Sequence, residues 1–331
     1  MRLVTGYWQF KTLAAAVDLD LFTRLSGGRR LTLEEVCSEL GLAERPADMF
    51  LAACASLGLL EKEGTRYRNS PLTEEFLVRG RPNYFGGQVR YCDERTYLAW
   101  HRIGEALRTD RPLTWDPDKQ RSLFDTAEPG MLEMFWEAMH SCSIFTARAL
   151  GGAYNFTPHK RMLDLGGGSG AFPIALCQMY THLEATIYDL AHVCPIARAK
   201  VASANLAHRV DVMDGDFITN AELPSGYDVI LLSMILHDAD EATNRTLLRK
   251  CHDALFPGGV VIISELLLDD DRTGPAEAAL MGLNMVVETK SGRNYSEGEY
   301  SRWLSVLGFT NVHRIDFEAP GSNGAIVGKK R

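Results

Sequence analysis

Apolar and polar residues follow two different periods along this chain. From residue 160 onward, short apolar runs that predict buried strands alternate with segments whose apolar residues recur at helical spacing. Strands are expected at about 161–165, 184–189, 209–214, 227–234, 259–267, 309–316 and 324–329. Alternating strands and helices imply a mainly parallel, doubly wound sheet with helices on both faces, so the predicted fold class is α/β.

The last two strand-like runs are separated only by the loop 320–324, Pro-Gly-Ser-Asn-Gly. So short a connection predicts a hairpin, because a parallel pair needs a long crossover. One edge strand of the seven-stranded sheet is therefore expected to run antiparallel to the rest. Ahead of this hairpin, Ser296 and Glu299 have the spacing of a capping box that opens the last helix.

The N-terminal part has the other period. Residues 8–25 carry apolar side chains at helical spacing, and Thr32 with Glu35 forms a capping box that predicts a second helix. A third helix is expected at about 46–57, and residues 59–68 alternate around a glycine like a β-hairpin. Helix, turn, helix and hairpin form the winged-helix arrangement.

Residues 84–150 are rich in aromatic side chains and are expected to be mainly helical, and Gly151, Gly152 and Pro158 mark a link to the α/β part. Some of these aromatic residues could line a pocket for an aromatic ligand, although most should be core. The predicted domains are a winged-helix domain over 1–85, a helical region contributing to a ligand pocket over 86–155, and the α/β domain over 156–331.

Composition narrows the possible partners. The chain has 331 residues and a formal charge of −8, so neither nucleic acid nor a membrane surface is an expected partner. Residues 1–80 contain 10 Lys and Arg against 11 Asp and Glu, which argues against a winged helix that grips DNA phosphates. The helix at 46–57 is mostly apolar and is expected to be buried, against another subunit for example.

The seven cysteines are scattered and include no C-x-x-C pair, so a zinc site is not expected and reduced thiols are the default. The N-terminus lacks a secretory pattern, and no apolar run has the length of a membrane span. We therefore expect a cytoplasmic protein.

The stretch Asp164-Leu-Gly-Gly-Gly-Ser-Gly170 joins the first predicted strand to a helix. Glycines there let the backbone turn tightly and let a ligand approach closely, and the helix N-terminus favours a negative group. The glycine spacing and Asp189 satisfy the loose dinucleotide fingerprint, whereas Asp164 and the glycines equally satisfy the pattern of S-adenosylmethionine (SAM) sites. A tight turn without a ligand is the third alternative.

Other features favour SAM over a nicotinamide cofactor. A C-terminal hairpin fits a SAM-dependent methyltransferase better, and acidic residues follow each of the first three strands. Asp189 could accept hydrogen bonds from ribose hydroxyls, and Asp216 from the adenine amino group, with Phe217 against the ring. Each acid alone could equally be a loop residue.

His237 follows the fourth strand, at the sheet edge where ligands of open α/β folds bind. An imidazole can take a proton near neutral pH, so His237 could remove the proton of a phenol that attacks a sulfonium methyl group. Glu265, after the fifth strand, could orient that imidazole. His237 could instead be a satisfied core or capping residue, and a metal site built on His237, Asp238 and Asp240 lacks a second cluster of ligands.

Over nearly its whole length the chain resembles the class I SAM-dependent small-molecule O-methyltransferases of the plant caffeate, hydroxyindole and bacterial antibiotic-pathway type. The resemblance is carried by the winged-helix start, the stretches at Trp100 and Phe135–Met139, Asp164–Gly170, Tyr188-Asp189-Leu190, Gly215-Asp216-Phe217, His237-Asp238, Pro257-Gly258-Gly259 and Glu265. It implies a Rossmann-like methyltransferase domain, a homodimer with interlocked N-terminal domains, and a role in secondary metabolism.

The resemblance also implies site residues. His237 would be the base and Glu265 its orienting acid. The cofactor, converted to S-adenosylhomocysteine, would contact Asp164, Gly166, Gly168, Gly170, Asp189, Leu190, Asp216, Phe217 and Ser233. A small aromatic substrate would contact Trp100, Phe135, Met139, Met281, Asn284 and Met285.

The chain departs from the family pattern at two positions. Ala239 stands where the family usually has a tryptophan, and Asn294 stands where it has a second acidic partner of the histidine. An amide can still hold an imidazole by a hydrogen bond, but it cannot stabilise the imidazolium by charge. Alternatives therefore remain open: a SAM-binding hydroxylase or decarboxylase of this fold, a SAM-sensing or DNA-binding regulator, and a nicotinamide oxidoreductase.

Overall fold

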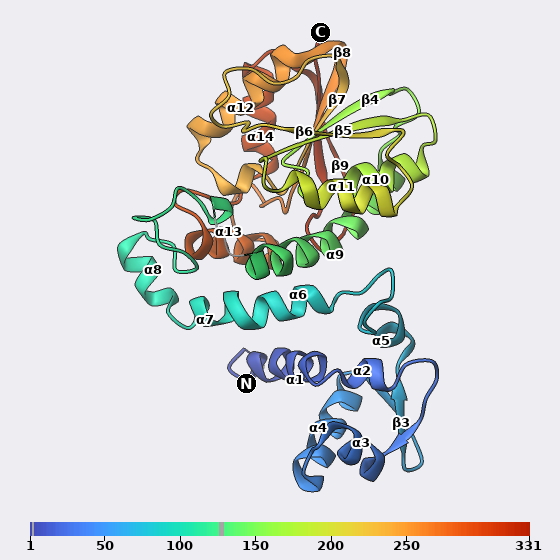
Figure 1. The fold of residues 1–331 in the computed structure, drawn as a ribbon. Coiled ribbons are helices and arrows are strands. Elements are labelled where there is room, and N and C mark those ends of the chain that lie inside the picture. Colours follow the sequence, from blue (N-terminus) through green and yellow to red (C-terminus); the bar gives the residue numbers. More distant parts are fainter. Residues whose placement is uncertain (2, 126–128) are drawn as a thin grey trace. The chain divides into compact units, whose positions relative to one another are not determined.

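The computed structural model describes residues 1, 3–125 and 129–331 (Figure 1). The chain divides into two compact units. The first comprises residues 1–98 with 133–141, and the second comprises residues 99–132 with 142–331. Among the described residues no helix is both long and apolar enough to cross a membrane.

The second unit is built on one sheet with strand order β6-β5-β4-β7-β8-β10-β9. Its strands are β4 (Arg161–Leu165), β5 (Glu184–Asp189), β6 (Val210–Asp214), β7 (Tyr227–Ser233), β8 (Leu255–Ser264), β9 (Thr310–Ile315) and β10 (Ala325–Lys329). The pairs among β4 to β8 are parallel, and β10 pairs antiparallel with both β8 and β9. The predicted seven-stranded Rossmann-like sheet with a terminal hairpin is confirmed.

The expectation that an edge strand runs against the others is wrong. The last strand, β10, inserts between β8 and β9, so the antiparallel strand lies inside the sheet and β9 forms the edge. Because β9 is antiparallel to β10, it runs in the same direction as β8. A hairpin in the sequence shows that two strands pair, but it does not show which of them reaches the sheet.

Alternate residues of the central strands enter two cores, one on each face of the sheet. Met162 and Leu231 pack in one core with residues of α9 (Pro129–Ala153), α10 (Ala171–Met179) and α11 (Cys194–Ser203). Leu163 and Leu232 pack in the other with residues of α12 (Glu241–Ala254) and α14 (Glu297–Val306). This burial on both faces explains why the strands are continuous apolar runs in the sequence. Figure 1 shows the helices flanking the sheet.

The helices of this unit have the following bounds: α8 Ile103–Thr109, α9 Pro129–Ala153, α10 Ala171–Met179, α11 Cys194–Ser203, α12 Glu241–Ala254, α13 Ala276–Glu288 and α14 Glu297–Val306, with short η2 Leu123–Asp125 and η3 Leu236–Asp238. The segment 133–141 of α9 belongs to the first unit. The predicted capping box is confirmed, because Ser296 accepts from the N–H of Glu299 while the Glu299 carboxylate accepts from the N–H of Ser296.

The first unit contains α1 Gly6–Asp18, α2 Leu21–Arg24, β1 Leu31–Thr32, α3 Leu33–Leu40, α4 Glu44–Ser56, β2 Leu60–Glu63, β3 Arg66–Asn69, α5 Pro71–Phe76, α6 Gly86–Tyr91 and a π-helical turn at Cys92–Thr96; α7, Tyr97–Trp100, crosses into the second unit. Two helices and a hairpin follow one another as predicted, and the Thr32–Glu35 capping box is confirmed. The single helix expected over 8–25 is wrong. The chain breaks at Asp20, whose φ of +57° is left-handed.

The region 84–150 is only partly helical. Helices α6 to α9 cover much of it, but residues 110–122 form no helix. Arg111-Pro112 and Asp116-Pro117 lie in this segment, and a proline lacks the N–H that a helix interior needs.

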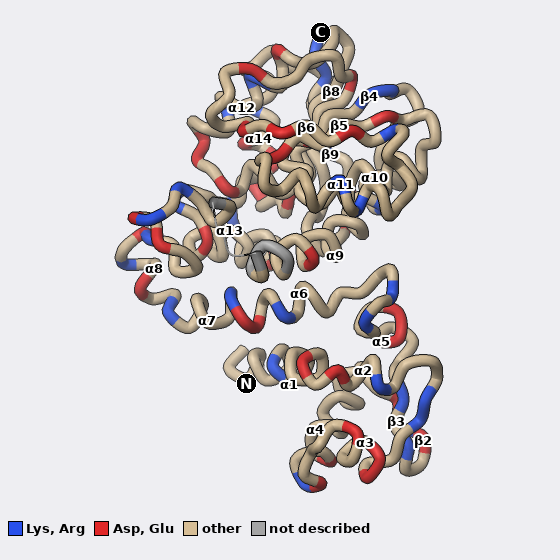
Figure 2. Tube along the Cα trace, viewed as in Figure 1, with Lys and Arg blue, Asp and Glu red and all other residues tan. Residues whose placement is uncertain are grey.

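Positive and negative residues are interspersed over the first unit (Figure 2). Arginines of the β2–β3 hairpin face acids: Arg66 lies 3.1 Å from Glu35, and Arg68 lies 2.6 Å from Glu61. Exposed pairs of this kind contribute little stability. They do, however, offset the positive charge that a hairpin would need to hold DNA phosphates.

The glycine turn connects β4 to α10 at the carboxyl edge of the sheet. Gly166, Gly168 and Gly170 have φ values of +65°, +54° and +79°. A side chain in this left-handed region is strained, and a Cβ on Gly170 would also lie 2.6 Å from Ile187 Cδ1. The turn therefore requires glycine at these positions for conformational reasons.

Gly170→Ala should destabilise the second unit by about 1–2 kcal/mol, the usual cost of a left-handed side chain, with the Ile187 contact adding to it. Gly152→Ala is the matched control, because Gly152 lies in α9 with open space around its Cβ position. We expect little change, or a gain below ~1 kcal/mol, for the control. Equilibrium unfolding in urea measures both, and equal midpoints for the two variants would contradict this account of the turn.

Candidate active site

Asp189, the last residue of β5, holds the glycine turn. It is buried, its Oδ2 accepts from the N–H of Gly168 at 2.7 Å, and its Oδ1 accepts from the N–H of Leu190 at 2.7 Å. Burial raises the pKa of Asp189 despite these two hydrogen bonds. The carboxylate therefore ties the turn after β4 to the end of the neighbouring strand.

Two buried polar atoms near this turn lack a hydrogen-bond partner among the described residues. They are Oδ2 of Asp164, on β4, and Oγ of Ser233, which ends the adjacent strand β7. Burial, and next the charge of Asp189, raise the pKa of Asp164 well above its usual value. An unsatisfied buried polar group costs about 1–3 kcal/mol, so these atoms fit a site in which a polar ligand satisfies them.

Phe217 packs beside the same turn. Its ring atom Cε1 lies 3.2 Å from the position of a Cβ on Gly166, so glycine there leaves room for the ring. Asp216 accepts from the N–H groups of Ile218 and Thr219 at 2.9 and 3.2 Å, and Lys250 donates to three carbonyl groups of the loop. The loop after β6 is thus fixed against the glycine turn, with the carboxylate of Asp216 partly exposed.

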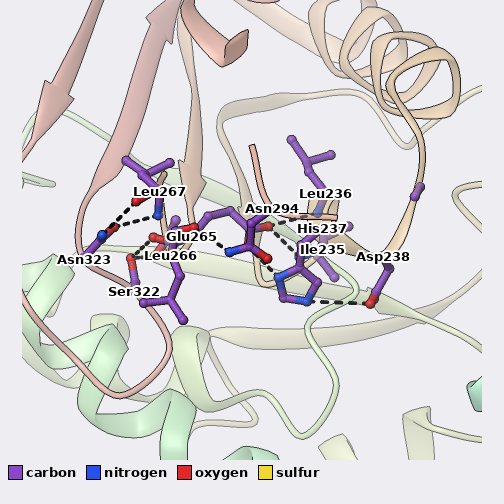
Figure 3. A network of polar contacts seen from close by, with 12 residues as sticks. Ile235, Leu236, His237, Asp238, Glu265, Leu266, Leu267, Asn294, Ser322 and Asn323 are labelled. Atoms are coloured by element: carbon purple, nitrogen blue, oxygen red, sulfur yellow. Dashed lines mark hydrogen bonds and ion pairs between the residues drawn. The ribbon is translucent and has the colours of Figure 1, made fainter. Parts of the chain in front are cut away.

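His237 lies in η3, directly after β7 (Figure 3). The chain leaves the strand through Met234, whose φ of +56° is left-handed. The side chain of His237 is buried, and its Nδ1 lies 2.8 Å from Oε2 of Glu265. The two side chains form an ion pair when the imidazole is protonated.

Glu265 also fixes the backbone that carries His237. Its other oxygen, Oε1, accepts from the N–H groups of Ile235 and Leu236 at 3.0 Å each. The residue is 1% exposed, so a carboxylate with two backbone donors and one imidazole is held inside the protein. The predicted closeness of Glu265 to His237 is thus present in the structure, while the roles of the two residues remain predictions.

The charges around His237 control its protonation. Burial alone would lower the pKa of His237, but the negative charges of Glu265 and Asp238 outweigh it and raise this pKa to about 9. Asp238 Oδ1 lies 3.6 Å from Nε2 of His237, which is beyond hydrogen-bond distance. Burial raises the pKa of Asp238 to about 6 even though His237 lowers it.

Asn294 lies near this pair. The hypothesis that its amide holds the imidazole by a hydrogen bond does not match its contacts. Its Nδ2 donates to the carbonyl oxygen of Leu266 at 2.6 Å, and its buried Oδ1 has no hydrogen-bond partner in the described part of the chain. No hydrogen bond joins Asn294 to His237 among these residues. Ala239, the other departure, accepts from the hydroxyl of Tyr295 at 2.7 Å through its carbonyl group.

The residues expected to contact a substrate are divided between the two units. Trp100 and α13, which carries Met281, Asn284 and Met285, belong to the second unit, and the indole N–H of Trp100 donates to Oδ1 of Asn284 at 2.7 Å. Phe135 and Met139 belong to the first unit. There the ring of Phe135 packs edge-on against Tyr91 and Trp136, with centroid distances of 5.5 and 4.9 Å.

Sequence reasoning did not single out Glu288. This residue ends α13 with only 8% of its surface exposed, and its Oε2 accepts from Nδ2 of Asn284 at 3.0 Å. The available signal was the spacing, because residues four apart share one face of a helix. No group of three or more His, Cys, Asp or Glu suited to a metal ion is found in the described part of the chain.

Comparisons with known proteins agree with this geometry. A family model described as "O-methyltransferase domain" matches residues 100–310, and one described as "O-methyltransferase dimerisation domain" matches residues 1–79. The chain is similar to 3-hydroxy-5-methyl-1-naphthoate 3-O-methyltransferase of Streptomyces sahachiroi, with 45% identity over 99% of this chain and 94% of the relative. It is 35% identical to the tetracenomycin polyketide synthesis 8-O-methyl transferase TcmO of Streptomyces glaucescens, over 100% of this chain and 96% of the relative.

The fold is similar to the crystal structure of human N-acetylserotonin methyltransferase in complex with SAM. The TM-score is 0.85 and the identity 26%, covering 99% of this chain and 96% of the human one. The fold, the glycine turn and the two matched domains agree, and the chain belongs to the family of SAM-dependent O-methyltransferases.

Proposed function

We propose that this enzyme methylates a hydroxyl group of an aromatic compound, phenolic or polyketide-like, and that His237 is the general base. The observation that carries the proposal is the buried His237–Glu265 pair at the carboxyl edge of the sheet, beside the glycine turn. When bound, SAM supplies a sulfonium methyl group that an oxygen nucleophile can attack.

The chain's own residues would prepare that nucleophile. A phenol has a pKa of about 10 and attacks poorly while protonated. Nε2 of His237 would take the hydroxyl proton as that oxygen attacks the methyl group supplied by SAM, and the products would be S-adenosylhomocysteine and an aryl methyl ether. The negative charge of Glu265 stabilises the imidazolium that results.

We infer that the glycine turn and the acids around it hold the cofactor. Asp189 would accept from the ribose hydroxyls and Asp216 from the adenine amino group, with Leu190 and Phe217 packing against the cofactor. The partnerless oxygens of Asp164 and Ser233 support this assignment, because a polar ligand would satisfy them. Much of the catalysis would then come from aligning oxygen, methyl carbon and sulfur.

Trp100, Met281, Asn284 and Met285, all of the second unit, are proposed to contact the aromatic substrate, and contacts from Phe135 and Met139 stay a prediction from the sequence. The naphthoate and tetracenomycin enzymes support a fused-ring aromatic substrate and a place in antibiotic or other secondary metabolism. Asn284, whose amide is bonded to Trp100 and Glu288, would contribute mainly its place in the pocket wall.

We further propose that the enzyme is a homodimer that works in the cytoplasm and has a winged-helix N-terminal domain. The dimerisation-domain match supports the dimer. In the first unit Tyr7, Trp8 and Met49 are 51%, 59% and 58% exposed, and apolar side chains of this size favour a covered surface. The paired arginines of the hairpin favour this role over DNA binding.

His237→Ala should lower kcat by about 10²–10⁴-fold, because it removes the general base, while affinity for SAM stays nearly unchanged. Mass spectrometry of reactions with hydroxynaphthoates, other naphthols, phenols and anthraquinones measures turnover, and calorimetry measures SAM binding. Equal loss of turnover and of SAM binding would mean that His237 is structural. A product that gains oxygen in place of a methyl group would point to a hydroxylase.

The kcat/KM of the wild-type enzyme should rise with pH toward about 9. Only neutral imidazole accepts a proton, and the pKa of His237 is raised to about 9, so the free enzyme holds the base protonated at neutral pH. Ionisation of the substrate phenol also changes with pH. Comparing two substrates whose phenols differ in pKa separates that ionisation from the ionisation of His237. A limb that follows the phenol pKa alone would contradict the assignment.

A further inference from the structure

Glu288 is a buried carboxylate that the proposed mechanism does not use. It is 8% exposed at the end of α13, and its backbone carbonyl accepts from the indole N–H of Trp115 at 2.6 Å. Leu113, two residues before Trp115, donates through its backbone N–H to Val287 O at 2.8 Å. The segment 113–115 therefore fixes the C-terminal end of α13, where Glu288 is the last residue.

A hydrogen-bonded relay fixes the Glu288 side chain. An indole N–H can only donate, so Oδ1 of Asn284 must face Trp100, at 2.7 Å. That orientation turns Nδ2 of Asn284 toward Glu288, where it donates to Oε2 at 3.0 Å. The relay therefore ends on a carboxylate oxygen that accepts a hydrogen bond.

The end of α13 lies against the turn that carries His237. Helix α13 packs on η3. After Glu288, the hydroxyl of Thr289 accepts from the N–H of Gly292 at 2.8 Å, and a Cβ on Gly292 would overlap the carbonyl oxygen of His237. Glu288 thus lies at the end of the helix that packs on the turn carrying His237. Its negative charge adds to those that raise the pKa of His237 and of Asp238.

We propose that Glu288 is a positioning residue for the reaction: held by the Trp100–Asn284 relay, its buried carboxylate adds to Glu265 and Asp238 a further negative charge that stabilises protonated His237. Asn294, which packs near the pair, is neutral and donates to Leu266 instead. The charge that position 294 cannot provide thus comes from a different element, the end of α13.

The inference builds on the proposed role of His237 as base. The other ionisable groups near His237 are Asp238 in its own element, Glu265 after β8 and Tyr295, whose hydroxyl donates to Ala239 O and whose pKa burial raises to about 12. Tyr295 stays neutral over the range in which His237 titrates. The titration of His237 therefore reports on the three acids.

Glu288→Gln tests this directly, because it keeps the shape and removes the charge. The enzyme carrying ¹³C-labelled histidine rings is titrated by NMR without substrate or cofactor, and the His237 signal is assigned from its loss in His237→Asn. In Glu288→Gln the midpoint of His237 should move to lower pH by ~1 unit, the effect expected for a lost neighbouring charge. The rising limb of kcat/KM should move the same way, with a lower plateau.

Glu277→Gln is the matched control, since Glu277 lies exposed on the same helix. It should leave the midpoint and kcat/KM unchanged. Trp100→Phe removes the relay's donor and should give a smaller downward shift, while Glu288→Asp should restore part of the wild-type midpoint. An unchanged His237 midpoint in Glu288→Gln would overturn the inference. The NMR titration does not depend on turnover. It therefore tests the role of Glu288 independently of the activity of His237→Ala, which tests the role of His237 as base.

Discussion

The buried carboxylate of Glu265 is the contact on which the site depends. One oxygen holds the backbone of Ile235 and Leu236, and the other lies against the ring of His237 (Figure 3). The main chain of the same residue is equally occupied: its carbonyl accepts from the Ser322 hydroxyl at 2.9 Å and the Asn323 N–H at 3.2 Å. A single residue thereby connects the terminal hairpin to the turn after β7.

The position of β10 inside the sheet affects the surroundings of Glu265. Because β10 pairs directly with β8, the loop before it, with Ser322 and Asn323, passes over the end of β8 where Glu265 lies. Asn323 also exchanges hydrogen bonds with the backbone of Leu267 through its Oδ1 and Nδ2. An antiparallel strand at the edge of the sheet would leave this end of β8 uncovered. Insertion of β10 thus helps to keep Glu265 buried and its charge effective.

The sequence predicted the parts of the fold that local patterns determine. The strands, the terminal hairpin and two capping boxes follow from periodicity and from side chains that satisfy nearby N–H groups. The strand order at the sheet edge did not follow, because pairing beyond neighbours along the chain leaves no local pattern. The break at Asp20 was missed because the apolar spacing continues through it. The helix ends there because the φ angle of Asp20 is left-handed, and the spacing does not reveal a backbone angle.

The same distinction applies to the site. His237 and Glu265 were predictable because each follows a strand, and the ends of parallel strands meet at one edge. Glu288 ends a helix, and its effect on His237 depends on where α13 packs, which no motif encodes. Position 294 was expected to act on the imidazole, yet its amide donates to Leu266 O. The residue type at position 294 therefore does not by itself determine the charge near His237.

Buried charge has a cost that the folded protein must offset elsewhere. Glu265 lies 2.8 Å and Asp238 3.6 Å from the ring of His237, and taking charged groups out of water costs free energy. The two backbone donors to Glu265 and the amide donor to Glu288 offset part of that penalty. Because Asn284 links Glu288 to Trp100, a residue expected in the substrate pocket is also bonded to the acid cluster. Trp100, Asn284 and Glu288 therefore form one hydrogen-bonded relay that ends on the helix packed against the turn of His237.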